Sequence, residues 1–133
     1  MSSQKIRTEL SKKNPYYISK YRRKELEYFC LQYKDYKDYL SVIGRRGTSS
    51  EWSDPTGDEA IKRSIYENNI RIIESSAKLA DDENAEYILK AVTEGLTWPY
   101  ISTHYNVKCY RNEFYNSLYK FFYILSSQKE HTF

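Results

Sequence analysis

The chain has 133 residues, 40% of them hydrophobic and 29% charged, with a formal net charge of +3 at pH 7. A chain of this length is expected to fold as one domain with a modest core. Tyr contributes 15 residues, whereas Gly contributes 4 and Pro 3, and this scarcity of helix breakers predicts an all-α protein. Two cysteines, Cys30 and Cys109, are too few for a disulfide framework or a zinc site.

Positive charge is concentrated near the N-terminus. Residues 1–46 hold 12 Lys and Arg against 5 Asp and Glu (12 − 5 = +7), and residues 47–133 hold 9 against 13 (9 − 13 = −4). A basic N-terminal part beside an acidic remainder is typical of a nucleic-acid-binding arm, and a solvated tail is the other interpretation. The longest apolar run, residues 121–125, is far too short to span a bilayer, so we expect no membrane association.

The first predicted elements are an arm and a long helix. Residues 1–15 have low hydrophobicity and predict a flexible basic arm. From Tyr16 to Ile43, apolar residues recur every three or four positions, which predicts a helix, with a break expected near Gln32. Arg22, Arg23 and Lys24 lie in its first turns, where the helix dipole disfavours cations, so we expect them to serve a partner.

The clearest loop, residues 44–50, places Arg45 and Arg46 between two glycines. Its spacing lacks the Lys and Ser/Thr of a phosphate-binding P-loop. A simple connector between helices is one interpretation, and a basic loop whose arginines touch a nucleic-acid backbone is the other.

A second long helix is predicted to end near Ala80. Thr56 and Glu59 have the spacing of a capping box at its start. Its apolar stripe consists of Ile61, Ile65, Ile72 and Leu79, widened by Tyr66, Ile70, Ile73 and Ala77. Packing against the first helix would make residues 16–80 an antiparallel helical hairpin, and a homodimeric coiled coil through the surplus apolar face is the alternative.

Residues 81–126 predict a trihelical helix-turn-helix unit, followed by a frayed tail over 127–133. Residues 81–84 cap its first helix, and Gly95 ends it. Thr97 caps a short helix with Pro99 in its first turn, and a turn around Asn106 leads to a longer helix. The second helix of such a pair can enter a DNA major groove.

Two sets of residues resemble known proteins. The stretch 96–125 resembles the DNA-binding unit of sigma-factor region 4. Residues 21–33 (YRRKELEYFCLQY) and 109–125 (CYRNEFYNSLYKFFYIL) resemble small helical proteins of phages and prophages of low-GC Gram-positive bacteria, grouped loosely with RinA/ArpU-type regulators of phage late transcription. The resemblance implies a phage- or prophage-encoded transcription regulator in the cytoplasm of a bacterial host cell, and the surplus apolar face of the second long helix favours a homo-oligomer.

The function predicted first is therefore binding of double-stranded DNA. Arg and Asn side chains of the recognition helix would hydrogen-bond to base edges. The N-terminal cations and Arg45 and Arg46 would bind phosphates. Residues 82–125 hold four cations against five acids, a net −1, so this unit needs cations from another segment to bind DNA tightly. The candidate DNA-binding residues are Lys108, Arg111, Asn112, Tyr115, Asn116, Lys120, Arg22, Arg23, Lys24, Arg45 and Arg46.

Other functions have less support. His104 has no acid or Cys at ligand spacing, and Cys109 suits packing, so we expect no catalytic residue, metal, cofactor or enzyme activity. The near-neutral recognition helix allows a protein-interaction module acting on RNA polymerase or its sigma factor. A small-terminase-like packaging component of a phage is a further alternative.

Overall fold

The computed structural model describes residues 11–46 and 57–130, and every regular element within them is an α-helix. The prediction of an all-α protein is therefore confirmed for this part of the chain. The helices are α1 (Lys20–Leu31), α2 (Tyr33–Arg46), α3 (Gly57–Ala80), α4 (Ala85–Glu94), α5 (Trp98–His104) and α6 (Arg111–Glu130).

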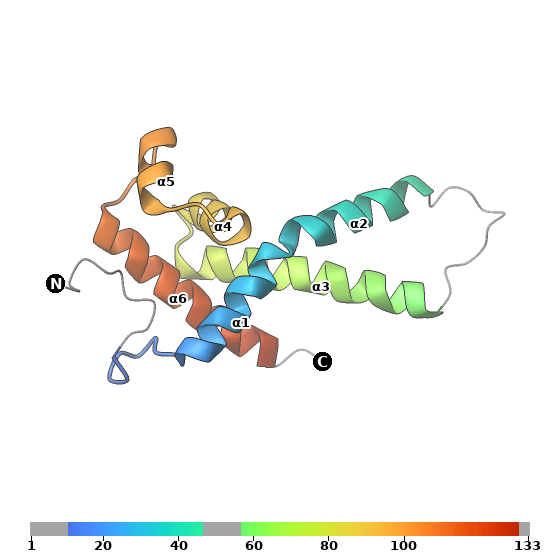
Figure 1. The fold of residues 1–133 in the computed structure, drawn as a ribbon, viewed down its shortest axis with the longest axis horizontal. Coiled ribbons are helices and arrows are strands. Elements are labelled where there is room, and N and C mark those ends of the chain that lie inside the picture. Colours follow the sequence, from blue (N-terminus) through green and yellow to red (C-terminus); the bar gives the residue numbers. More distant parts are fainter. Residues whose placement is uncertain (1–10, 47–56, 131–133) are drawn as a thin grey trace.

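The longest helix, α3, lies at the centre of the arrangement. It packs against α6, α2 and α4, whereas α1 packs against α4 and α6 (Figure 1). The first half of α3 extends to one side of the molecule together with α2, and the other helices gather around its second half (Figure 1). The described part of the chain contains no helix with both the length and the apolar character needed to cross a membrane.

The first predicted helix is two helices in the structure. It begins at Lys20 instead of Tyr16, because the Ser19 hydroxyl caps α1 by accepting a hydrogen bond from the Arg22 N–H at 3.2 Å. It is interrupted at Gln32, where a break is expected from the sequence. The interruption lets α1 pack against α4 and α6 while α2 follows α3.

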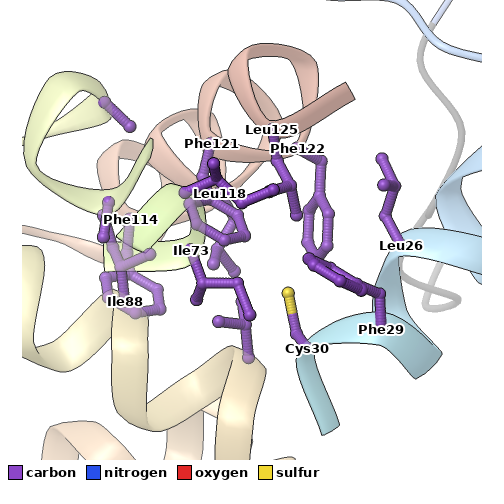
Figure 2. Close-up of a cluster of buried hydrophobic side chains, with 14 of the residues drawn as sticks. Leu26, Phe29, Cys30, Ile73, Ile88, Phe114, Leu118, Phe121, Phe122 and Leu125 are labelled. Carbon is purple, nitrogen blue, oxygen red and sulfur yellow. The ribbon is translucent and has the colours of Figure 1, made fainter. Parts of the chain in front are cut away.

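The core is formed where α6 meets α1, α3 and α4. Figure 2 shows the aromatic and aliphatic side chains of α6 pointing toward the buried residues of α1 and α3. Cys30 is fully buried there, and burial raises the pKa of its thiol, so it packs as a small apolar side chain. The most buried members of the cluster are Leu26, Cys30, Ile72, Ile73, Ala77, Ile88, Ile101, Phe114, Phe121 and Leu125.

The stripe predicted for α3 is only partly buried. Ile72 is in the core, whereas Ile61, Ile65 and Leu79 are 59%, 51% and 63% exposed. Ile73 and Ala77, predicted only to widen the stripe, are fully buried because α6 packs on that side of α3. The Thr56 half of the predicted capping box lies outside the described residues.

Helix α6 also continues past Ser126, where the helix-turn-helix unit was predicted to end. The Gln128 amide donates to the Ser76 hydroxyl at 2.9 Å and accepts from the Ser75 hydroxyl at 3.2 Å. These contacts with α3 hold the last turn of α6, which reaches Glu130.

We predict that Ile73→Ala lowers the free energy of unfolding by about 2–5 kcal/mol, because it opens a cavity in the core. Ile65→Ala removes the same side-chain atoms from an exposed position of the same helix and should cost less than about 1 kcal/mol. Urea unfolding followed by circular dichroism measures both. Equal losses of unfolding free energy in the two variants would contradict the finding that Ile73, and not Ile65, lies on the buried side of α3.

Candidate nucleic-acid interface

The short helix α5 begins as the sequence predicts. Gly95 follows α4 with φ 70°, a left-handed conformation that favours glycine. The Thr97 hydroxyl accepts from the Tyr100 N–H at 3.4 Å, and Pro99 lies in the first turn. Ile101 is fully buried and anchors α5 to the core.

Helix α6 begins at Arg111, so Lys108 lies in the connection that precedes it. Tyr110 is the N-cap residue of α6, because its carbonyl accepts the first helical hydrogen bond, from the Phe114 N–H at 2.9 Å. The Glu113 carboxylate accepts from the Tyr110 N–H at 2.8 Å, as the acid of a capping box does. The connection between α5 and α6 therefore covers residues 105–110 and is longer than the predicted turn.

A small polar network fixes this connection against α4 and α6. Asn84 is buried, and its side-chain carbonyl accepts from the Lys108 N–H at 3.3 Å. Its amide donates to the Asp81 carboxylate at 3.1 Å, and the Ser117 hydroxyl of α6 donates to the same carboxylate at 2.9 Å. The residues predicted only to cap α4 therefore also position the start of α6.

The candidate residues on α6 lie mostly at the surface. Arg111, Asn112 and Asn116 are exposed, whereas Lys120 and Tyr115 are half-buried. The Arg111 guanidinium lies 5.5 Å from the centre of the Tyr115 ring, a cation–π contact. The first two turns of α6 therefore present an arginine and two carboxamides to solvent.

The described end of the N-terminal arm lies against this surface. Hydrogen bonds from the Asn14 N–H to the Ser11 carbonyl (2.9 Å) and from the Tyr16 N–H to the Asn14 side chain (2.8 Å) fold it into turns. The Tyr16 ring packs edge-on against Tyr123 at 5.7 Å.

An open pocket of about 270 Å³ separates this turn segment from α6. Its lining residues are Asn14, Pro15, Tyr16, Asn116 and Tyr119. Lys12 and Lys13 directly precede this segment in the chain, and both side chains are exposed.

Two candidate phosphate ligands on α1 have partners within the fold. The Arg22 guanidinium donates to the Ser126 hydroxyl (2.9 Å) and carbonyl (3.2 Å) and to Glu25 (2.8 Å). Arg23 donates to Glu27 at 2.9 Å and lies 4.1 Å from the Phe122 ring centre. Burial lowers the pKa of Arg23, and the Glu27 charge opposes this. These arginines join α1 to the end of α6.

The structure does not bring the other candidate cations to the start of α6. Lys24 is exposed on α1, two residues after Arg22, whose guanidinium contacts Ser126 near the end of α6. Ser126 is fifteen residues from Arg111, or about 22 Å along the helix. Arg45 and Arg46 end α2 on the side of the molecule opposite to α5 and the start of α6 (Figure 1).

Negative charge surrounds the other side of the connection. Burial raises the pKa of the Cys109 thiol, and the nearby carboxylates of Asp81, Glu113 and Glu83 raise it further. These acids disfavour a phosphate close to Cys109. No cluster of three or more metal-ligating side chains occurs within 11–46 and 57–130.

The sequence predicts that N-terminal cations hold phosphates, but sequence reasoning missed Asn14, Pro15 and Tyr16 as residues that line a pocket with α6. The Asn14-Pro15 pair signals a turn, but no local pattern indicates that the turn lies against a helix about a hundred residues later. Comparisons of the chain with protein-family models, with curated proteins and with solved structures found no match.

The electrostatic surroundings of Cys109 lead to a prediction about its alkylation. Glu113→Gln keeps the acceptor for the Tyr110 N–H but removes a negative charge, which lowers the thiol pKa and increases the thiolate fraction at pH 8. We expect iodoacetamide to modify Cys109 severalfold faster in this variant, as measured by mass spectrometry.

Glu130→Gln, at the far end of α6, is the matched control and should leave the rate unchanged. The buried Cys30 should stay unmodified throughout and reports folding. An unchanged Cys109 rate in Glu113→Gln would show that Glu113 does not act on the thiol.

Proposed function

We propose that this chain is a DNA-binding transcription regulator that meets a duplex with the first turns of α6. In this proposal α2 and α3 form an antiparallel helical hairpin, and α4, α5 and α6 form the helix-turn-helix unit. The observation that carries the proposal is the position of the N-terminal turn segment: Asn14, Pro15 and Tyr16 line a pocket together with Asn116 and Tyr119 of α6, and the exposed Lys12 and Lys13 directly precede them in the chain.

The first turns of α6 would supply the base contacts. Recognition helices of this class read base edges with their N-terminal residues, which here are Arg111, Asn112 and Asn116. Arginine pairs with guanine through two hydrogen bonds, and asparagine does so with adenine. The turn segment lies against Tyr119 and Tyr123 and so leaves the start of α6 as the accessible part.

The phosphate contacts would come from outside the helix-turn-helix unit. Residues 82–125 carry a net −1, whereas residues 11–20 contain three lysines and no acid, so the two segments together carry +2. Counterion release depends on the number of cations that meet phosphates, so Lys12 and Lys13 would raise affinity for any sequence. Lys108 and Lys120 would add contacts on either side of the base-reading residues.

A second copy of the chain would complete the complex. Val42, Ile61 and Ile65 leave aliphatic surface exposed on α2 and α3, at 45%, 59% and 51%. Pairing of two hairpins would cover such surface and present two copies of α6, which is how dimeric regulators bind two half-sites. RNA polymerase would be the further partner of such a regulator.

The proposal predicts salt-sensitive DNA binding that depends on the turn segment. The double variant Lys12→Glu, Lys13→Glu should bind duplex DNA at least about tenfold more weakly, and the slope of log affinity against log salt should fall by about 2. Fluorescence anisotropy with a labelled mixed-sequence duplex, and with the DNA upstream of the chain's own gene, measures both quantities.

The double variant Lys34→Glu, Lys78→Glu makes the same charge change at exposed positions of α2 and α3 and should weaken binding much less. Arg111→Ala should instead reduce discrimination between sequences. Absence of salt-sensitive binding at micromolar protein, or equal weakening by both double variants, would refute the proposal.

A further inference from the structure

A row of aromatic side chains crosses from α4 to the end of α5. The Tyr87 and Tyr105 ring centres are 5.9 Å apart, and those of Tyr105 and Tyr100 are 6.5 Å apart. The rings of Tyr100 and His104 are stacked at 3.9 Å with an interplanar angle of 13°. These contacts make a continuous aromatic surface, which we call the α4–α5 aromatic row (Tyr87, Tyr100, His104 and Tyr105).

The exposed end of this row is held in place before any partner arrives. Tyr100 is 44% exposed and His104 is exposed, although the two rings cover each other on one face. A ring nitrogen of His104 lies 2.9 Å from the Tyr100 carbonyl, within hydrogen-bond distance. Stacked rings that are already ordered lose little conformational entropy on binding, which is the property of aromatic anchors in protein interfaces.

Charged side chains share the face of α4 on which the row begins. On α4, Tyr87, Lys90 and Glu94 follow one another at spacings of three and four residues, so they share a face, and the exposed Glu86 borders it. The Lys90 ammonium lies 5.0 Å from the Tyr105 ring centre, so one ring of the row already takes part in a cation–π contact.

We propose that the α4–α5 aromatic row is a docking surface for a basic segment of a partner protein. An Arg or Lys side chain of that segment lies on the outer face of the Tyr100–His104 stack, where the ring quadrupoles favour a cation. Glu86 and Glu94 then bind neighbouring cations of the segment through charge-assisted hydrogen bonds. A basic segment is favoured over a nucleic acid at this surface, because the exposed carboxylates of Glu86 and Glu94 attract cations and repel phosphates.

The test uses two labelled peptides, one of repeated Arg-Ala-Leu-Arg units and one in which every Arg is Glu. Fluorescence anisotropy with the full chain should show saturable binding of the basic peptide and none of the acidic one. Tyr100→Ala should weaken the basic peptide about fivefold or more, in line with the loss of one aromatic anchor, and Tyr100→Phe should retain binding because the ring remains.

Matched controls separate this surface from general electrostatic attraction. Glu94→Gln should weaken binding, whereas Asp38→Asn, which removes the same charge from an exposed position of α2, should not. Tyr28→Ala removes a 64% exposed ring from α1 and should have no effect. Circular dichroism confirms that each variant is folded.

The proposal is overturned if the basic peptide does not bind, or if Tyr28→Ala weakens it as much as Tyr100→Ala does. Displacement of the peptide by duplex DNA that depends equally on Tyr100 would identify the row as a nucleic-acid surface instead. The Lys12→Glu, Lys13→Glu variant should bind the peptide normally, so the failure of this proposal and that of the DNA-binding proposal are distinguishable.

Discussion

The packing of α6 on the second half of α3 is the interaction on which the other helices depend. Phe114, Phe121 and Leu125 of α6 and Ile73 and Ala77 of α3 are all buried within the same cluster (Figure 2). Helices α1 and α4, which also pack against each other, complete this core, and α5 reaches it through Ile101. Because the face of α6 that packs is fixed, so is the face that carries Asn112 and Asn116 to solvent.

Charge is unevenly distributed over the described surface. The exposed Lys12 and Lys13 directly precede the turn segment that lines a pocket with α6, whereas the acids near Cys109 raise the pKa of its thiol. The first proposal uses these two lysines for DNA phosphates. The second uses a different place, the α4–α5 aromatic row with Glu86 and Glu94, for a basic protein segment.

The arginines of α1 show how a charge pattern can serve the fold. Their position in the first turn of a helix is unfavourable for the dipole, and that pattern predicted a partner outside the chain. The structure instead gives Arg22 the hydroxyl and carbonyl of Ser126, and places Arg23 against Glu27 and Phe122. The sequence did indicate that these charges need a partner, but not that the partner is α6.

The amino-acid sequence by itself determined the helical class, the break at Gln32, the end of α4 at Gly95 and the cap of α5 at Thr97, because these depend on neighbouring residues. Only the tertiary structure decided which side of α3 is buried, since Ile61 and Ile73 are equally apolar and differ only in where α6 packs. It also decided the candidate interface, because Asn14 and Asn116, about a hundred residues apart in the chain, line the same pocket, and no local pattern encodes such a meeting.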